Sequence, residues 1–146
     1  MDDLIINVAE IEDYRIRRNI AWNDDKSYLD ILINDEEPSV RSAVATRGIK
    51  KHLDVLVNDS NFQVRSMVAR FGDKSHRDIL VNDYDHRVKN TVAVYGDKSH
   101  HDILVNDYYH TVRREVAKYG DKSHRDILAN DKDFRVRHAI ARNNAS

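Results

Sequence analysis

The stretch FGDKSHRDILVND at residues 71–83 returns as YGDKSHHDILVND at residues 95–107 and as YGDKSHRDILAND at residues 119–131. The same 24-residue period extends without insertions over 12–35, 36–59, 60–83, 84–107 and 108–131, with a half unit at 132–146. A period of this length is typical of stacked repeats in which each unit contacts its neighbours. We therefore expect one repeat domain over 1–146, with 1–11 as an N-terminal cap, five repeats at 12–131 and a C-terminal half repeat.

The first half of each repeat has the pattern of an amphipathic helix. Val64 and Val68 lie four residues apart and Phe71 three further on, which is the spacing of one apolar helix face. Gly72 follows as a helix-ending residue. We expect a helix of about ten residues per repeat, with an aspartate just ahead of it that accepts backbone N–H groups. The equivalent residues are Val40 and Val44, then Val88, Val92 and Tyr95, then Val112, Val116 and Tyr119, with Gly48, Gly96 and Gly120, and with Asp59, Asp83, Asp107 and Asp131.

The second half of each repeat predicts a shorter helix. Ser75 and Asp78 fit a capping box at its start, and an apolar triplet follows at 79–81. Because only about two helical turns fit here, part of this element is expected to be 3₁₀. One alanine per repeat is predicted to lie where neighbouring helices approach closely. The box recurs at 27–30, 99–102 and 123–126, and the alanines are Ala21, Ala45, Ala69, Ala93, Ala117 and Ala141.

The recurring core LxxDxxxxVRxxVAxxG resembles the leucine-rich repeat variant family and, more loosely, HEAT repeats. The resemblance implies an all-α fold, a right-handed α-solenoid of about five and a half two-helix repeats, used mainly for macromolecular interaction. The 24-residue period favours the variant family, since HEAT units are longer and usually have two full helices. The iron–sulfur segment of some variant proteins has no counterpart here, because the chain has no cysteine.

Composition narrows the functional classes. Without cysteine, thiolate metal sites are excluded, and a formal net charge of −1 argues against indiscriminate binding of polyanions. No stretch reaches the roughly 18 apolar residues of a membrane span, and the N-terminal MDDLIINVAE is acidic where a signal peptide would be basic. We therefore expect a soluble, cytoplasmic protein without a cofactor.

Recurring aspartates and histidines invite a catalytic or metal-binding interpretation, but a structural one accounts for them. Equivalent residues in stacked repeats lie about 8–10 Å apart, whereas zinc ligands lie about 2.0–2.1 Å from one ion. We interpret the aspartates as helix caps and the histidines as solvated residues of the first turn. No active site and no metal site are predicted, and a DNA glycosylase built on such repeats would need an isolated acid that is not found. The residues are Asp30, Asp54, Asp78, Asp102 and Asp126, and His52, His76, His100 and His124.

A cation recurs at one place in every copy, and in all copies but the first it comes six residues after the aspartate that precedes the long helix. We expect these cations to pair with the aspartates across the joints between repeats. They are Arg17, Arg41, Arg65, Lys89, Arg113 and Arg137.

The fourth, seventh and eleventh places of each repeat form the predicted solvent-facing stripe of the first helix, and none of them is acidic. Two interpretations stay open: a cationic face that binds a partner, with Trp22 as an anchor, or basic side chains that simply solvate an exposed helix. Within this stripe, the residues from Ser39 to Ser66 carry no positive charge and form a gap. The candidate binding residues are Arg15, Arg18, Trp22, Arg70, Arg87, Arg114, Lys118, Arg135 and Arg142.

A second variable cluster lies at the corners of the fourth and fifth repeats. Its aromatic residues are candidates for a partner interface or for wedges between successive repeats. They are Tyr84, Tyr108 and Tyr109, with His86 and His110 beside them.

The leading hypothesis is a non-enzymatic scaffold that binds a protein with an acidic or mixed-charge surface. The alternative is binding of nucleic acid through its phosphate backbone, since regularly spaced arginines suit a polyanion. Against it stand the neutral overall charge and the gap in the stripe. A monomer is expected, with self-association through the open ends as the other arrangement.

Overall fold

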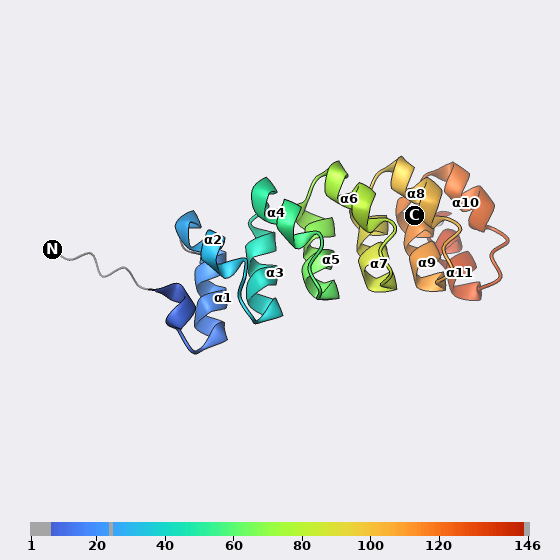
Figure 1. Cartoon of the computed structure of the whole chain (residues 1–146). Helices are drawn as coiled ribbons and strands as arrows, with labels where there is room; N and C mark the ends of the chain where they lie inside the picture. Colours follow the sequence, from blue (N-terminus) through green and yellow to red (C-terminus); the bar gives the residue numbers. More distant parts are fainter. Residues whose placement is uncertain (1–6, 24, 145–146) are drawn as a thin grey trace. The chain divides into compact units, whose positions relative to one another are not determined.

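The computed structural model describes residues 7–23 and 25–144, in which helices alternate with short turns and no strand occurs. The expected all-α architecture of two-helix repeats is confirmed. The chain divides into two compact units, 1–71 and 72–146 (Figure 1). The expectation of a single domain over 1–146 stays a prediction, and residues 1–6 of the N-terminal cap lie outside the described part.

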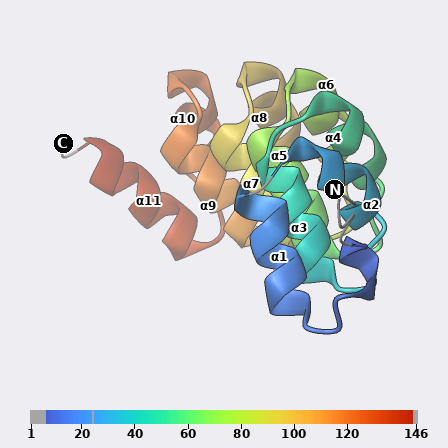
Figure 2. The same cartoon turned by 90° about the vertical axis from the view of Figure 1, so that its left-hand side faces the viewer.

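The first unit alternates long and short helices. Its long helices α1, α3 and α5 pack side by side in chain order, and the short ones connect them (Figures 1 and 2). The 3₁₀ character expected of the short elements occurs in the first repeat. The elements are η1 (Val8–Glu10), α1 (Tyr14–Asn23), η2 (Lys26–Tyr28), α2 (Leu29–Leu32), α3 (Pro38–Thr46), α4 (Lys50–Leu56) and α5 (Phe62–Phe71).

The second unit repeats this order with little variation. Its long helices α7, α9 and α11 pack in sequence; α8 and α10 each contact the long helices before and after them, and α6 contacts α7. The elements are α6 (Lys74–Leu80), α7 (His86–Tyr95), α8 (Lys98–Leu104), α9 (His110–Tyr119), α10 (Lys122–Leu128) and α11 (Phe134–Asn144).

The core combines the predicted valines and alanines of the long helices with leucines of the short helices. Val64, Val68 and Ala69 are fully buried in α5, and the equivalent residues of α3, α7 and α9 are buried likewise. Two expectations were wrong at the margins. Phe71 and its equivalents Tyr95 and Tyr119 are exposed, because they close the last turn of each helix. Ala141 in α11 is exposed as well.

The short helices of the second unit begin with a capping box, but not the predicted one. The N-cap residue is Asp73, whose carboxylate accepts the N–H groups of Ser75 and His76, while its own N–H donates to His76 Nδ1 at 3.1 Å. Ser75 is therefore an N–H donor inside the first turn. The same box forms between Asp97 and His100 and between Asp121 and His124.

The aspartates predicted to cap the long helices instead close the turn that precedes each helix. Asp83 accepts the N–H of Asp85, and Asp85 is the N-cap of α7, accepting the N–H of Arg87 at 2.9 Å. Asp83 thus closes a turn before the helix. Its equivalents Asp59, Asp107 and Asp131 do the same for residues 61, 109 and 133.

The predicted ladder of cation–aspartate pairs is confirmed for four of the six cations. Arg17 of α1 donates to Asp35, which precedes α3, at 2.6 Å, and Arg113 of α9 donates to Asp131, which precedes α11, at 2.7 Å. Their side chains are 5–7% exposed. The pairs Arg41–Asp59 and Lys89–Asp107 follow the same pattern. Each pair fixes one long helix to the start of the next.

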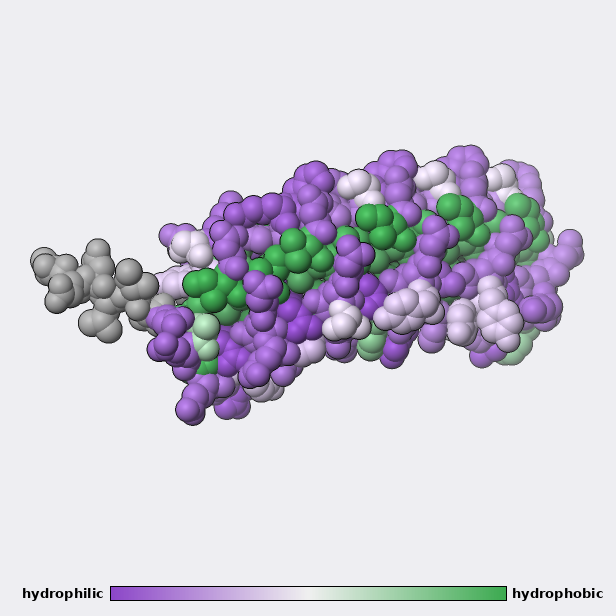
Figure 3. All heavy atoms as spheres, viewed as in Figure 1, coloured by the Kyte–Doolittle hydropathy of each residue, from purple (hydrophilic) through white to green (hydrophobic). Residues whose placement is uncertain are grey.

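An exposed apolar side chain recurs on every short helix. Ile31 and Val55 in the first unit, and Ile79, Ile103 and Ile127 in the second, are each between 45% and 57% exposed. Figure 3 shows apolar spheres over the short helices, among polar ones. The exposed pairs Lys50–Asp54, Lys74–Asp78, Lys98–Asp102 and Lys122–Asp126 lie on the same helices.

Candidate functional site

A cationic groove of about 230 Å³ lies between α9 and α11 in the second unit. It gathers four of the candidate residues, two from each helix, because their places in the repeat fall on the same helix face. Phe134, which is 67% exposed, contributes an apolar wall. We call this the α9–α11 groove; its polar lining is Arg114, Lys118, Arg135, His138 and Arg142.

The positive charge of the α9–α11 groove is only partly neutralised. Asp133 lies 2.8 Å from Arg135, whose hydrogen bond is the main reason that the pKa of Asp133 is strongly lowered. Glu115 lies 3.3 Å from Arg114 and 3.2 Å from Lys118. Two carboxylates thus face four cations.

Arg142 differs from the other cations of the α9–α11 groove. It makes no hydrogen bond or ion pair with the described residues, 7–23 and 25–144. Its charge is therefore available to an incoming anion.

The remaining arginines of the stripe differ in whether they pair with a carboxylate at a helix start. Arg15 and Arg87 each pair with the N-cap carboxylate two residues earlier, Asp13 and Asp85, at 2.8 Å and 2.7 Å. The hydrogen bond from Arg87 is the main reason that the pKa of Asp85 falls to about 2. These two arginines therefore bind the carboxylates that cap their own helices. Arg70 at the end of α5 is exposed, with its guanidinium 5.0 Å from the ring of Phe71.

A second groove, of about 310 Å³, lies on the long helices of the first unit. It brings together the candidates Arg18 and Trp22 of α1 with residues of α3 and α5. Phe62 and Met67, which line it, were not predicted, because they lie outside the three places of the stripe. We call this the α1–α5 groove; the remaining residues that line it are Ser39, Ser42, Gln63 and Ser66.

The middle of the stripe is not solvent-facing as predicted. Ser39, Ser42 and Thr46 are half-buried and Ser66 is buried, because α1, α3 and α5 pack side by side and small side chains fill the space between them. The gap in the positive charge thus coincides with part of the lining of the α1–α5 groove.

The corner tyrosines differ in their contacts. Tyr109 stacks on His86 with ring centroids 4.6 Å apart, so it wedges between successive repeats. Tyr84 and Tyr108 are 79% and 84% exposed. Tyr108 also lines an open depression with His110 and Lys132.

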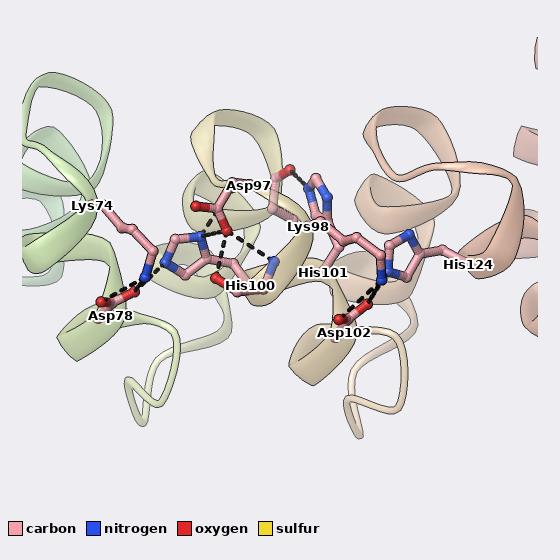
Figure 4. A network of polar contacts seen from close by, with 10 residues as sticks. Lys74, Asp78, Asp97, Lys98, His100, His101, Asp102 and His124 are labelled. Atoms are coloured by element: carbon pink, nitrogen blue, oxygen red, sulfur yellow. Dashed lines mark hydrogen bonds and ion pairs between the residues drawn. The ribbon is translucent and has the colours of Figure 1, made fainter.

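The recurring histidines are buried, so the expectation of solvated side chains was wrong. His100 Nδ1 accepts the N–H of Asp97 at 2.9 Å, and its Nε2 lies 2.8 Å from Asp78 of the preceding short helix (Figure 4). A neutral imidazole that accepts at Nδ1 carries its proton on Nε2 and donates it to Asp78. His124 and His52 contact Asp102 and Asp30 in the same way, at 2.7 Å and 2.6 Å.

The aspartates of these contacts are held in the ionised form. The pKa of Asp78 is lowered by the hydrogen bond from Lys74 and, to a smaller extent, by that from His100. The ring of His101 is bound elsewhere, with Nε2 2.7 Å from the carbonyl oxygen of Ala93. Among the described residues, no group of three or more histidine or acidic side chains could hold a metal ion. These histidines and aspartates join repeats.

No protein-family model matches the chain, and no curated protein matches it in sequence. Among solved structures, the chain is similar to a leucine-rich repeat variant with a novel repetitive structural motif, with a TM-score of 0.80 and 26% identity. The likeness covers 92% of this chain and 58% of that one, so the chain spans little more than half the length of the solved structure. The predicted resemblance to leucine-rich repeat variants is confirmed. No helix of the described residues is long and apolar enough to cross a membrane.

Proposed function

We propose that this chain, whose repeats have the fold of a leucine-rich repeat variant, is a non-enzymatic scaffold that binds a protein with an acidic or mixed-charge surface. The observation that carries the proposal is the α9–α11 groove, in which Arg114, Lys118, Arg135 and Arg142 face only two carboxylates. Stacked repeats supply extended surfaces of this kind for partners.

The residue types of the groove are those of protein interfaces. Arginine and aromatic residues are enriched there and dominate the binding free energy when they are desolvated. Phe134 offers an exposed ring beside Arg135, whose guanidinium carbon lies 5.8 Å from the ring centroid. Arg142 adds a cation that pairs with none of the described residues. An acidic side chain next to an apolar one would satisfy both features.

A protein partner is favoured over nucleic acid by the local charge balance. Arg15, Arg87 and Arg135 are each neutralised by a carboxylate two residues earlier, which removes regular cations from the stripe. A phosphate backbone requires several unneutralised cations in sequence. In the second unit the positive excess lies in the α9–α11 groove rather than in a row of evenly spaced cations.

Other features of the chain support a binding role without catalysis. The recurring aspartates and histidines are engaged in caps and in contacts between repeats. The absence of cysteine fits a reducing compartment such as the cytoplasm. We place the chain there as a monomer, with self-association as the arrangement that ultracentrifugation would detect.

Fluorescence anisotropy tests the proposal with two labelled probes, a peptide of alternating glutamate and phenylalanine and a DNA duplex. We expect saturable binding of the peptide at near-physiological salt, and Arg142→Glu should weaken it by about tenfold or more. The matched control is Arg15→Glu, because Arg15 is already paired with Asp13; it should change the affinity less than about twofold.

The outcomes separate the two candidate functions. Steeply salt-dependent binding of the duplex, stronger than that of the peptide, would favour nucleic acid. No binding of the peptide, or equal losses in Arg142→Glu and Arg15→Glu, would overturn the assignment of the α9–α11 groove. Thermal melts of both variants must match the parent chain.

A further inference from the structure

The α1–α5 groove has walls suited to one large apolar side chain. The ring of Trp22 is 44% exposed at the end of α1, and Phe62 and Met67 of α5 line the same groove. Its volume of about 310 Å³ is at the small end of the range for ligand pockets, ~300–1,000 Å³. A single side chain fits this space better than a cofactor does.

Arg18 gives this groove a cation that none of the described carboxylates neutralises. Its guanidinium carbon lies 5.0 Å from the ring centroid of Trp22 and 5.9 Å from that of Tyr14, which holds the planar group in place. Within the described residues, no carboxylate pairs with it. Arg15, one turn earlier in α1, shows the contrast, because it binds Asp13 through two nitrogens at 3.0 Å and 2.8 Å.

Hydrogen-bonding groups at the groove also lack partners. Arg18 Nε and Ser39 Oγ are buried without a hydrogen bond. The residue Ser66 is 9% exposed, and its hydroxyl makes no hydrogen bond with the described residues. Buried polar groups of proteins are nearly always hydrogen-bonded. The Arg18 and Ser39 atoms therefore indicate that an acceptor is supplied from outside.

We propose that the α1–α5 groove binds a short peptide segment of a protein partner, in which an aromatic or large aliphatic residue stands next to an aspartate or glutamate. The apolar side chain packs against Trp22 and Met67. The carboxylate accepts hydrogen bonds from the guanidinium of Arg18, whose parallel N–H groups match the two carboxylate oxygens. Ser66 donates to a carbonyl of the segment. The inference rests on the proposed function for the class of partner and adds the sequence feature that this unit recognises.

Charge complementarity selects this occupant over a strand of nucleic acid. The groove has one unneutralised cation, which matches one carboxylate, whereas a phosphate backbone offers a negative charge at every step. Removal of the carboxylate from the segment would leave Arg18 unpaired in the complex. Removal of the apolar residue would leave the Trp22 ring in water.

The position of Trp22 makes occupancy directly measurable. Trp22 is the single tryptophan of the chain, so the intrinsic tryptophan fluorescence of the full chain reports on this groove. The probes are the capped peptides Ac-Gly-Asp-Phe-Gly-amide, Ac-Gly-Asn-Phe-Gly-amide and Ac-Gly-Asp-Ala-Gly-amide. We expect a saturable change with the first, with a Kd of about 1 mM or below, and at least about fivefold weaker binding of the other two.

Variants assign the effect to Arg18. Arg18→Met retains the aliphatic stem and removes the charge, so it should weaken the Asp-Phe peptide by about fivefold or more and bring its affinity close to that of the Asn-Phe peptide. The control Arg15→Met lies on the same helix and should change the affinity less than about twofold. Matching circular dichroism and thermal melts exclude misfolding.

The inference is overturned if tryptophan emission does not saturate up to about 10 mM Asp-Phe peptide. It is also overturned if the Asp-Phe and Asn-Phe peptides bind equally, or if Arg15→Met acts as strongly as Arg18→Met. Arg142→Glu separates it from the proposed function, because that change lies in the other unit and should leave the Trp22 titration unaltered. Retained binding through Arg142 without a Trp22 response would sink this inference alone.

Discussion

His100 of α8 and Asp78 of α6 join two successive repeats, with Nε2 and Oδ1 2.8 Å apart. The imidazole is 1% exposed, whereas the carboxylate is about half exposed. Through Nδ1 the same ring accepts the N–H of Asp97, the N-cap of its own helix. One side chain thus closes a helix start and fixes it to the preceding repeat.

Replacement of His100 by alanine should lower the free energy of unfolding by about 2–4 kcal/mol, because it leaves a cavity and an unpaired N–H of Asp97. Urea unfolding followed by circular dichroism measures the loss. The control His138→Ala removes an exposed histidine and should stay within about 0.5 kcal/mol. Equal losses in the two variants would show that the contacts of His100 do not stabilise the fold.

The pair between Arg113 and Asp131 should behave as a buried ion pair. Arg113→Met leaves a carboxylate that is 7% exposed without its cation, at an expected loss of about 3–5 kcal/mol. The double change Arg113→Met with Asp131→Asn should recover part of that loss, because the amide stays neutral and still accepts from the N–H of Asp133.

The comparison is Arg135→Met, whose pair with Asp133 is half exposed on the arginine side and should be worth about 0–1 kcal/mol. A double-mutant cycle of urea melts gives the coupling of Arg113 with Asp131. A double variant no more stable than Arg113→Met alone would contradict the expectation.

Two glycines at equivalent places should respond differently to alanine. Gly96 has no room for a side chain, because an added Cβ would lie 2.5 Å from the carbonyl oxygen of Val92 and 2.9 Å from His100 Nδ1. At Gly48 an added Cβ would lie 3.7 Å from the carbonyl oxygen of Phe71, an ordinary contact, but the φ of this residue is +67°. We expect Gly48→Ala to cost about 1–2 kcal/mol for its conformation.

Gly96→Ala should cost more, because the backbone itself has to shift. Thermal melts of the two variants test the order, and Gly120→Ala provides a repeat, with an added Cβ 2.7 Å from the carbonyl oxygen of Val116. A smaller loss for Gly96→Ala than for Gly48→Ala would show that the close approach is relieved without cost.

Acid should lower the free energy of unfolding by protonating the aspartates that cap the short helices. The pKa values of Asp73, Asp97 and Asp121 are lowered to about 2, first by the hydroxyl of the serine two residues later. Unfolded aspartate titrates near 3.9, so between about pH 4 and pH 2 the unfolded chain binds more protons. Stability from these groups is therefore complete above about pH 4 and is lost as the pH falls through about 2.

The triple change of Ser75, Ser99 and Ser123 to alanine should reduce this pH dependence, because the folded pKa values then lie closer to those of the unfolded chain. Urea melts at about pH 4.5 and about pH 2 at constant ionic strength measure it. Equal losses in the parent and the triple variant would show that the serine hydroxyls do not hold these pKa values down.

Much of the fold follows from the sequence, because the 24-residue period fixes which residues are equivalent. The buried valines, five of the six alanines and the pairs of Arg17, Arg41, Lys89 and Arg113 with aspartates were predicted. The capping boxes were not, since the letters DKSHRD contain both Ser-x-x-Asp and Asp-x-x-His. Only the backbone conformation of Asp73 shows which one forms.

The candidate sites were less predictable for a physical reason. Sequence places Arg114, Lys118, Arg135 and Arg142 on one stripe, and the packing of α9 against α11 brings them into one groove. The sequence does not show which arginines are already neutralised. An arginine is neutralised only where the carboxylate two residues earlier adopts the N-cap conformation. The walls that Phe62 and Met67 give to the α1–α5 groove depend on how closely α1, α3 and α5 approach.

The exposed isoleucine and valine side chains of the short helices bear on solubility. They recur once per repeat, so a second apolar surface could match them one by one. Each short helix of the second unit also has a lysine–aspartate pair that is about half exposed or more and adds little to stability. Such charges act as gatekeepers against aggregation, because a second surface would have to strip water from both members of every pair. The lysines thus act mainly against aggregation, whereas Asp78 and Asp102 also bind His100 and His124 of the next repeat and so join the repeats.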